Sequence, residues 1–426
     1  MLALEEHKHH TEHKPIERLP VPVKVYLPLS QHLGKPCLSL VKVGEIVREG
    51  QKIADAQAHV SSPIHSSING VVCAIQDWPH PVLGRSKAIV IEHKRDGEGA
   101  KVIEARSQEE VNLLTVEAIR QIVSEAGIVG MGGASFPTFI KLTPPKPVDT
   151  LIINGAECEP YLTADYRLMI EKTKEVMQGI DLAKKCLGVT QVVIAIEDNK
   201  PEAIRIFREL IGDSGYGVRV LKSSYPQGGE KQLVKNLLGK EVPSGKLPFA
   251  VGVVVHNVAT ICAIYEAVYC RKPLYERVVT VTGSCITEPK NLLVPLGTPL
   301  KALLEYCGPF SSEPAKVITG GPMMGIAQYS LDAPVIKSTN GIICFSEDQV
   351  RTSEAATCIR CGRCVEQCPV GLMPCLINLA SSKEKWDLSK TYGAMECMEC
   401  GLCNYTCPQK INLVQNIKQA KERCKK

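Results

Sequence analysis

Two cysteine runs near the C-terminal end constrain this chain more than any other feature. Both have the spacing C-x2-C-x2-C-x3-C-P, which is typical of thiolates that bind [4Fe–4S] clusters. Three closely spaced thiolates on a tight loop can hold three corners of a cubane, and the fourth turns away toward a neighbouring cubane. The first run contains Cys358, Cys361, Cys364 and Cys368, and the second contains Cys397, Cys400, Cys403 and Cys407.

Because the fourth thiolate serves the neighbouring cluster, the spacing predicts two ligand sets that cross between the runs. Gly362 and Gly401 keep side chains away from the cubanes and leave backbone N–H groups free to bond their sulfides. Paired C-x2-C motifs also occur in zinc ribbons, but two full copies with the x3-C-P ending favour clusters. Cluster one would take Cys358, Cys361, Cys364 and Cys407, and cluster two would take Cys397, Cys400, Cys403 and Cys368.

Length and composition indicate an ordinary globular protein of several domains. A chain of 426 residues is long enough for three or four domains. Its 44% hydrophobic and 22% charged residues are typical of soluble folds. The net charge of +5 is mild and spread along the chain, so it does not indicate a nucleic-acid partner.

Cysteine usage points to a reducing compartment. Of 19 cysteines, eight belong to the two runs, and the others are scattered among apolar neighbours. We expect these others to be buried free thiols, and we find no signal peptide, so the sequence predicts a cytoplasmic protein. The most apolar stretch, residues 247–269, is interrupted by polar side chains and is not expected to span a membrane. Any membrane association would be peripheral, through a partner.

The N-terminal quarter is predicted to be a tail followed by a β-rich module. Residues 1–20 contain four histidines among Lys and Glu, which favours a solvated tail. Residues 41–53 alternate with glycines at the turns and predict a hairpin, and Asn69-Gly70 predicts a two-residue turn. The segment resembles the barrel-sandwich modules of lipoyl and biotinyl domains. It lacks their lysine at a hairpin tip, so we expect a packing or docking element.

The middle of the chain alternates between strands and helices. Ser107 and Glu110 form a capping-box signal that predicts one amphipathic helix to about Ala126. Residues 278–317 return to short strands around a helix near 299–306, which indicates an α+β unit, and the chain closes with a helix. The alternation itself predicts an α/β layer with a largely parallel sheet. Its strands are expected at 150–154, 192–196, 218–221 and 251–255, and its helices at 165–187, 201–211, 230–238 and 258–270.

A glycine-rich stretch, residues 127–133, is the first candidate for a binding loop. It follows a helix rather than a strand and lacks the spacing of a dinucleotide fingerprint or a P-loop. A plain turn is the simpler explanation. However, a loop without side chains exposes several N–H groups, and Lys141 lies just downstream. That combination suits a flavin phosphate and the flat isoalloxazine ring.

Three further loops follow predicted strands of the same sheet, where open α/β folds bind ligands. They span residues 154–160, 225–230 and 256–260 and are rich in Gly, Asn and Glu. Each has a simple structural explanation, since Asn257 could only cap its helix and Glu230 could only favour a helix N-terminus. Four such loops at one sheet edge nevertheless favour a binding site.

At these loops the chain resembles the C subunit of Rnf-type ion-translocating oxidoreductase complexes, over roughly residues 15–420. The segments that carry the resemblance begin at Gly130, Asn154, Tyr225 and Gly320, and read GMGGASFPT, NGAECEPYLTAD, YPQGGEKQL and GGPMMG. More distantly, the chain is similar to the NADH-binding flavoprotein subunit of respiratory complex I. The family usually opens with a Gly-Gly-Ile-His-Pro element, which this chain lacks.

The resemblance implies a multidomain α/β and α+β fold. We expect an N-terminal tail (1–20), a barrel-sandwich hybrid module (21–106) and a Rossmann-like FMN/NADH-binding α/β domain (107–276). A small SLBB-type β-grasp domain (277–345) and a bacterial-ferredoxin-like 2[4Fe-4S] domain (346–426) would follow.

The resemblance also implies which residues bind the flavin and the nicotinamide cofactor. Ala156 and Gly229 differ from the complex I family, which has acidic residues at both positions. Glu159 and Glu230 would orient the nicotinamide and ribose during catalysis, and with Phe136, Lys246 and Phe249 they would line the NADH pocket. FMN would contact Gly130, Gly132, Gly133, Lys141, Asn154, Glu157, Tyr225, Gly228 and Asn257.

The expected function is therefore that of an NADH-dependent flavin and iron–sulfur oxidoreductase, an electron-transfer subunit of a membrane-bound ferredoxin:NAD oxidoreductase. Its cofactors would be FMN, NAD(H) and two [4Fe-4S] clusters. Its partners would be the other Rnf-type subunits and, indirectly, ferredoxin, on the cytoplasmic face of the membrane. The alternatives are a soluble relative coupled to a reductase such as proline reductase, an electron adaptor that has lost its flavin, and a scaffold with structural clusters.

Overall fold

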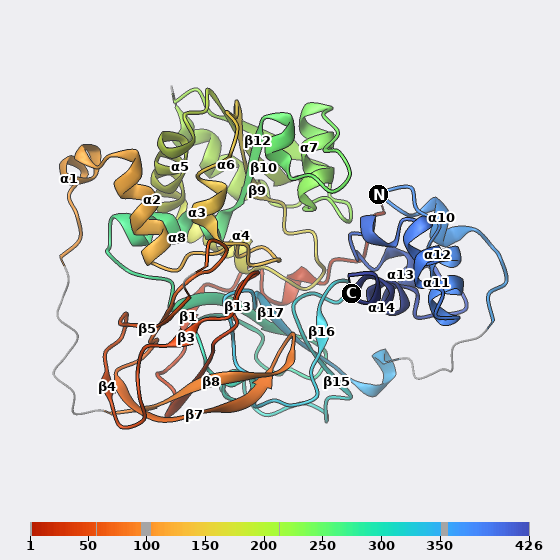
Figure 1. Ribbon diagram of the computed structural model, residues 1–426, viewed down its shortest axis with the longest axis horizontal. Helices are drawn as coiled ribbons and strands as arrows, with labels where there is room; N and C mark the ends of the chain where they lie inside the picture. The colour runs from red at the N-terminus through yellow and green to blue at the C-terminus, as the bar shows by residue number, and fades with distance from the viewer. Residues whose placement is uncertain (1, 57, 95–103, 213, 351–356, 426) are drawn as a thin grey trace.

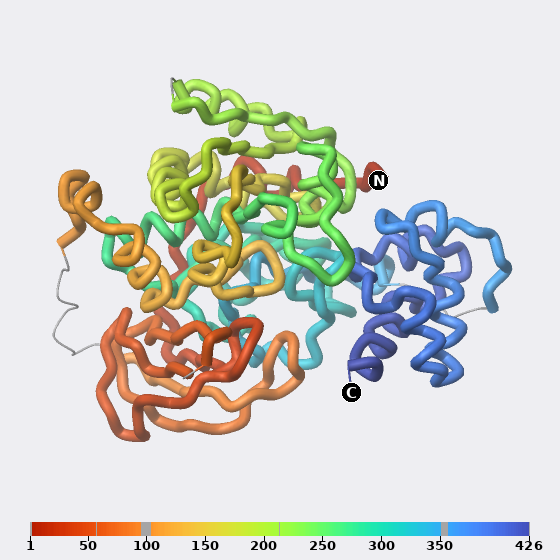
Figure 2. The backbone as a smooth tube through the Cα atoms, turned by 45° about the horizontal axis from the view of Figure 1, so that its top comes forward, coloured from red at the N-terminus to blue at the C-terminus, as the bar shows by residue number. Residues whose placement is uncertain are grey.

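The computed structural model describes residues 2–56, 58–94, 104–212, 214–350 and 357–425 (Figure 1). An α/β domain lies above a barrel-like module and a second β-rich domain, and the cysteine-rich domain lies to one side. The tube view shows the same arrangement, with the N-terminal end beside the cysteine-rich domain (Figure 2).

The α/β domain is built on a four-stranded, fully parallel sheet, as the alternation predicts. Buried Val and Ile fill its central strands, because helices cover both faces. In order across the sheet its strands are β11 (Gly217–Leu221), β10 (Gln191–Glu197), β9 (Thr150–Gly155) and β12 (Val253–Asn257). Its helices include α3 (Thr138–Lys141), α6 (Pro201–Ile211), α7 (Glu230–Leu238) and α8 (Val258–Val268), with the 3-10 turn η2 (Pro248–Val251) before β12.

Two predicted helices are each divided. The capping box at Ser107 is present, but it opens only α1 (Gln108–Leu113). Thr115 then caps a new helix, α2 (Val116–Glu125), by accepting a hydrogen bond from the backbone of Ala118. The expected helix at 165–187 is likewise α4 (Ala164–Glu171) and α5 (Thr173–Leu187), separated at Lys172.

The N-terminal module is a sandwich of two antiparallel sheets, but its strand pairing differs from the prediction. The predicted hairpin at 41–53 is wrong, because the two strands there, β4 (Ile46–Val47) and β5 (Lys52–Asp55), lie in different sheets. The predicted turn at Asn69-Gly70 is wrong too, since Asn69 links two strands that do not pair with each other. One sheet orders β2 (Lys24–Pro28), β8 (Gly84–His93), β7 (Gly70–His80) and β4 (Ile46–Val47), and the other orders β3 (Leu38–Ser39), β5 (Lys52–Asp55) and β6 (Ile64–His65).

The third domain is a mixed six-stranded sheet packed with one helix, α9 (Leu300–Tyr306), close to the predicted 299–306. Its edge strand β1 (Ile16–Arg18) comes from the N-terminal segment and pairs in parallel with β14 (Lys290–Pro295). The other strands are β13 (Glu276–Thr282), β14 (Lys290–Pro295), β15 (Lys316–Thr319), β16 (Ile326–Ala327) and β17 (Gly341–Phe345).

The predicted solvated tail at 1–20 is wrong for its described part. Lys8, in the 3-10 turn η1 (Lys8–His10), is only 6% exposed, and Thr11 is fully buried. Charge and histidine content predict a solvated segment, yet its charges have partners far along the chain. The Lys8 ammonium donates to three backbone carbonyls, and the Glu6 carboxylate accepts from the side-chain amide of Asn199.

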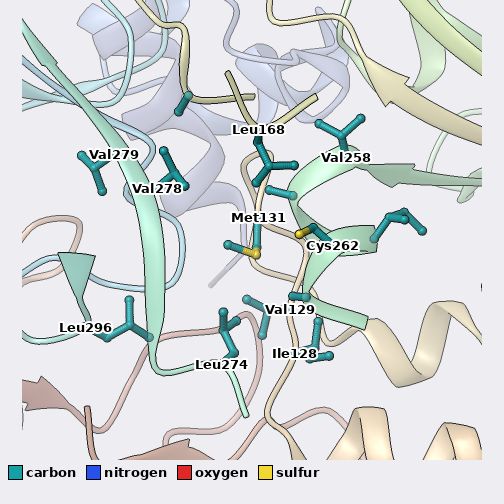
Figure 3. Close-up of a cluster of buried hydrophobic side chains, with 14 of the residues drawn as sticks. Ile128, Val129, Met131, Leu168, Val258, Cys262, Leu274, Val278, Val279 and Leu296 are labelled. Atoms are coloured by element: carbon teal, nitrogen blue, oxygen red, sulfur yellow. The ribbon is translucent and has the colours of Figure 1, made fainter. Parts of the chain in front are cut away.

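The three N-terminal domains share one hydrophobic core, which runs from the barrel-like module through the α/β domain into the β-rich domain. Figure 3 shows where it passes from Met131 and Cys262 in the α/β domain to Val278 and Leu296 in the β-rich domain. Most cysteines outside the two runs are buried and free, including Cys37, Cys186, Cys262, Cys307 and Cys344, as expected.

The cysteine-rich domain is helical and has small cores of its own. Among the described residues, no helix in the protein is long and apolar enough to cross a bilayer. After the short turn η3 (Glu347–Gln349), the elements are α10 (Arg363–Glu366), α11 (Pro374–Ser382), α12 (Trp386–Thr391), η4 (Ala394–Glu396), α13 (Leu402–Thr406) and α14 (Leu413–Cys424).

Candidate functional site

The four loops singled out in the sequence meet at the carboxyl edge of the parallel sheet. Asn154 lies at the end of β9 and donates through Nδ2 to the carbonyl of Gly228 at 2.9 Å. The Gly228 amide donates in turn to the Cys158 sulfur at 3.3 Å. At Gly228 a Cβ would lie 2.7 Å from the Ala156 carbonyl oxygen, so a side chain is excluded where these two loops cross.

The glycine-rich loop is closed at its base and open at its tip. Its Gly130 amide donates to the Phe136 carbonyl at 2.8 Å, and the Met131 amide donates to Thr260 Oγ1 at 2.9 Å. Gly132 and Gly133 are exposed. A Cβ on Gly132 would lie 3.1 Å from Asn257, which places the loop directly against the start of α8. The loop therefore presents bare backbone beside a polar side chain.

Buried polar atoms around this loop fit a bound polar group. Ser135 Oγ and Thr138 Oγ1, at the end of the loop and the start of α3, are buried without a hydrogen-bond partner in the described protein. His256 Nε2, on strand β12, is also buried without a hydrogen-bond partner in the described protein. Burial lowers the pKa of this histidine to about 3, so the ring is neutral. Unpaired buried donors and acceptors cost free energy, which a ligand with polar groups can offset.

Lys141 and Glu230 come together across the site, although they are 89 positions apart in the sequence. The Lys141 ammonium forms an ion pair with Glu230 and donates to the Val255 carbonyl at 3.0 Å. Glu230 is the first residue of α7, where a carboxylate also favours the helix dipole. Both side chains keep some exposure, so the pair borders the open part of the site.

Glu157 and Asn257 each have a structural role at a helix start. The Glu157 carboxylate accepts from the Asp165 and Tyr166 amides at 2.9 and 3.2 Å. Asn257 caps α8, which agrees with the structural role considered for it from the sequence. Its Nδ2 also donates to Asp165 Oδ2 at 2.6 Å. Burial and the neighbouring Glu157 carboxylate raise the pKa of Asp165.

Glu159, which is expected to orient the nicotinamide cofactor together with Glu230, makes hydrogen bonds to a different domain. Its carboxylate instead accepts from the backbone amides of Met323 and Met324, at 3.0 and 2.9 Å, in the loop between β15 and β16. Burial raises its pKa from 4.5 to about 7. The structure thus places this residue at the contact between the α/β domain and the β-rich domain.

The residues predicted to stack and bind the nicotinamide cofactor differ in their exposure. Phe136 is half-buried in the glycine-rich loop. Phe249, in η2, is half-buried and packs against the main core. Lys246 is exposed. That these three residues form one pocket with Glu159 stays a prediction.

Tyr225 joins the α/β domain to the cysteine-rich domain. It is 1% exposed, and its hydroxyl donates to the Cys400 carbonyl at 2.7 Å. Close by, Gln232 on α7 donates to the Pro369 carbonyl at 3.0 Å, and the Met398 side chain packs against Gly229. The loops predicted to hold flavin therefore contact the loop of the second cysteine run directly.

The predicted cluster ligands are arranged unequally. The four thiols predicted for cluster two line one apolar cavity, together with Met398, Leu402 and Ile417. Of the other set, Cys364 and Cys407 pack in one apolar cluster, while Cys358 and Cys361 are exposed. In the described chain, no group of three or more His, Cys, Asp or Glu side chains is compact enough to hold a single metal ion. The cavity and its soft sulfur donors fit an iron–sulfur cluster.

Models of known families match four segments of the chain. The model of the Nuo51 FMN-binding domain matches residues 123–266, and that of the 4Fe-4S dicluster domain matches residues 357–411. The RnfC barrel sandwich hybrid domain matches residues 2–97, and the SLBB domain matches residues 278–327. The fold class expected from the resemblance is confirmed.

Full-length relatives decide the family. The chain is 45% identical over 420 residues to the C subunit of the proton-translocating ferredoxin:NAD(+) oxidoreductase complex of Clostridium ljungdahlii, covering 98% of this chain and 92% of the relative. The chain belongs to the family of C subunits of ion-translocating oxidoreductase complexes. It is also 44% identical over 405 residues to the C subunit of the Na(+)-translocating complex of Acetobacterium woodii, covering 94% of this chain and 90% of the relative. Identity to the corresponding protein of Rhodobacter capsulatus is 42%, over 88% of this chain and 73% of the relative.

Solved structures agree on the fold. The crystal structure of an NAD+-reducing [NiFe]-hydrogenase in the H2-reduced state superposes with a TM-score of 0.51 and 19% identity, covering 72% of this chain and 62% of that chain. As a member of this family, the chain has an FMN-binding domain and a 4Fe-4S dicluster domain, and the predicted FMN and cluster cofactors are confirmed.

Sequence reasoning missed one residue and one contact of this site. Lys8 lies beneath the Glu157 loop, and no local pattern distinguishes it from the surrounding charged residues. The contact of Tyr225 with the second cysteine run is equally unpredictable from local sequence patterns, because it joins positions 175 apart.

Proposed function

We propose that this protein is the NAD(H)-linked electron-transfer subunit of a membrane-bound, ion-translocating ferredoxin:NAD oxidoreductase. The observation that carries the proposal is the direct contact between the flavin-domain loops and the second cysteine run, through Tyr225 and Cys400. Such contact suits a protein that exchanges electrons between the two modules. When bound, FMN supplies hydride exchange with NADH and one-electron exchange with the [4Fe–4S] clusters.

We assign FMN to the open loop at Gly132 and the sheet edge beside it. The bare backbone there would donate to the flavin, and Ser135 Oγ and Thr138 Oγ1 offer further polar groups. Lys141, held by Glu230 and the Val255 carbonyl, supplies positive charge beside an anionic phosphate. The residues proposed to contact FMN are Gly130, Gly132, Gly133, Lys141, Asn154, Glu157, Tyr225, Gly228 and Asn257.

The NADH pocket is proposed on the exposed side of the same loop, between Phe136 and the Lys246–Phe249 segment. Glu230, which keeps partial exposure beside Lys141, is the residue we expect to orient the nicotinamide ribose. Glu159 is kept as a proposed member of the pocket, although its hydrogen bonds to Met323 and Met324 support a role in holding the β-rich domain.

The eight cysteines are proposed to bind the clusters in the crossed arrangement. The shared cavity of one set supports the assignment of Cys397, Cys400, Cys403 and Cys368 to a single cluster. The other cluster would then take Cys358, Cys361, Cys364 and Cys407. The exposure of Cys358 and Cys361 leaves that side open to an electron-transfer partner.

The protein is a peripheral subunit of a membrane complex, and we propose that it lies on the cytoplasmic face, where NADH is found. The relatives named above are subunits of translocating complexes, which favours this function over a soluble protein coupled to proline reductase. The proposed domain boundaries remain 1–20, 21–106, 107–276, 277–345 and 346–426.

An anaerobic visible spectrum of the purified protein, with and without NADH, tests the proposal. We expect a yellow flavin band that bleaches with NADH, accompanied by loss of the broad iron–sulfur absorption. Material that carries no flavin, or that ignores NADH under oxygen-free conditions, would refute it.

Glu230→Gln tests the nicotinamide pocket in the same assay. We expect kcat/KM for NADH oxidation to fall by about tenfold or more, with iron and flavin content unchanged. Glu202→Gln, at an exposed position on α6, is the matched control and should behave as the unaltered protein.

A further inference from the structure

The segment from Leu2 to Arg18 is a strap that links three domains. Leu2 pairs with Tyr225 through two backbone hydrogen bonds of 3.1 and 2.8 Å. Thr11 bonds to Thr163 of the α/β domain at 2.7 Å through their hydroxyls. The strap then forms β1 at the edge of the β-rich domain. Figure 1 shows it passing from the cysteine-rich domain between the other two.

Lys8 is the most deeply bound charge of this strap. Its ammonium donates to the carbonyls of Glu157, Glu159 and Leu162, at 2.8, 2.9 and 2.6 Å. An ammonium has three donors, so these three bonds use all of them on a single loop. Burial lowers the pKa of Lys8, and the carboxylate of Glu157 opposes this.

The loop held by Lys8 has a conformation that needs external support. Tyr161 has a φ of +69°, in the left-handed region that side chains other than glycine rarely adopt. Its amide donates to the Glu6 carbonyl at 2.7 Å, and its ring stacks on His7 at 4.6 Å between centroids. The strap thus holds the loop through three consecutive residues, Glu6, His7 and Lys8.

The side chains of this loop diverge toward two domains. The Glu157 carboxylate points to the start of α4, and the Glu159 carboxylate points to Met323 and Met324 of the β-rich domain. Three carbonyls of this loop converge on one ammonium, while its two carboxylates contact different elements. A displacement of the loop would therefore move the flavin-side residues and the domain contact together.

We propose that Lys8 is a positioning residue for the flavin site. It acts through the loop of residues 157–162 and does not touch the cofactor, and the inference rests on the proposed assignment of Glu157 and Gly228 to FMN. The ammonium is suited to this role because its three donors share one compact nitrogen, whereas the donors of a guanidinium are spread over a rigid planar fork.

The test compares Lys8→Met with two variants of the same strap. Lys8→Met keeps the length of the side chain and removes all three donors. Lys14→Met also removes an ammonium-to-carbonyl bond, of 2.9 Å to Pro289, but at an exposed site on the β-rich domain. Thr11→Val removes a buried bond of the strap without touching the carbonyls of the loop.

We expect Lys8→Met to raise the dissociation constant of FMN by about tenfold or more, since three buried carbonyls lose their donor. The visible circular dichroism and the midpoint potential of the bound flavin should change with it. Thr11→Val should lower the thermal midpoint of unfolding without these flavin changes, and Lys14→Met should alter neither. A Lys8→Met protein with the dissociation constant, dichroism and potential of the unaltered chain would overturn the proposal.

A second variant covers the case in which Lys8→Met does not fold. His7→Ala removes the stacking on Tyr161, together with an exposed contact to Glu5 at 3.5 Å within the strap. It should raise the FMN dissociation constant about two- to threefold, as expected for one aromatic contact. An unchanged value would count against the role of the strap. If the unaltered protein itself binds no FMN, the proposed function fails, which is distinct from failure of the Lys8 proposal.

Discussion

The position of Glu159 predicts how the stability of the protein should depend on pH. Its half-buried carboxylate accepts from the Met323 and Met324 amides, and the Tyr225 hydroxyl lies at 3.4 Å. Burial nevertheless dominates and raises its pKa from 4.5 to about 7, so the folded protein holds this proton more tightly than the unfolded chain does. The stabilisation from Glu159 is then complete below about pH 4.5 and is lost as the pH rises through 7.

The size of the effect follows from the two pKa values. A rise from 4.5 to about 7 corresponds to about 3 kcal/mol, at about 1.36 kcal/mol for each pH unit. Because the side chain is only half-buried, solvent screening makes this an upper limit. Glu159→Gln removes the titration and keeps one carbonyl acceptor. The free energy of unfolding of the unaltered protein minus that of the variant should thus fall as the pH rises from about 5 to about 8.

Urea unfolding under oxygen-free conditions, followed by circular dichroism, measures this difference. Asp165, whose pKa is also raised to about 7, is present in both proteins and cancels. Glu202→Gln, at an exposed position, is the control and should give curves parallel to those of the unaltered protein at every pH. Parallel curves for Glu159→Gln would refute the reasoning, and a tenfold rise in KM for NADH alone would favour the nicotinamide pocket instead.

Three further substitutions test the site. Tyr225→Phe removes the donor to the Cys400 carbonyl and should weaken docking of the cysteine-rich domain by about 1–3 kcal/mol, seen as faster amide exchange around Cys400. Cys361→Ala should lower the iron content from about eight to about four atoms per chain, while NADH still reduces the flavin. Gly228→Ala would place a Cβ 2.7 Å from the Ala156 carbonyl oxygen and should raise the FMN dissociation constant about tenfold, measured by flavin fluorescence.

Each of these has a matched control. Tyr405→Phe alters an exposed tyrosine on α13 and should leave amide exchange unchanged. Cys73→Ala alters an exposed cysteine outside the two runs and should keep the full iron content. At Gly217 the nearest atom to an added Cβ is 3.8 Å away, so alanine should be tolerated there. Full iron content in Cys361→Ala would contradict the assignment of that thiol to a cluster. Unaltered amide exchange in Tyr225→Phe would contradict its role in docking, and unaltered FMN affinity in Gly228→Ala would contradict the argument from the crossing of the two loops.

Local patterns are sufficient to predict the α/β domain. Strands such as β9 and β10 are runs of Val and Ile bounded by turn residues, and their predicted and observed bounds agree within two residues. The break between α1 and α2 is not predictable in this way, because Thr115 is an ordinary residue until it caps a helix. The predicted pairing of β4 and β5 is wrong, since alternation defines which side chains face inward but not which strand lies alongside.

The site is predictable only where residues act within their own loop. The glycines and Asn154 lie where the motifs predict, and the loops do meet at one sheet edge. The directions of Glu159 and Tyr225 depend on Met323 and Cys400, which belong to domains that pack against them from far along the chain. The burial of Lys8 has the same origin, because its acceptors lie about 150 residues away.

The shared core of the first three domains has a consequence for damage by oxygen. A continuous apolar interior should melt as one cooperative unit, whereas the cysteine-rich domain has separate small cores and should melt separately. Loss of iron would then unfold the cysteine-rich domain and leave the first three domains folded. In a calorimeter, air-exposed protein should keep its main heat-absorption peak and lose a minor one, so that a cell could rebuild the relay without refolding the rest.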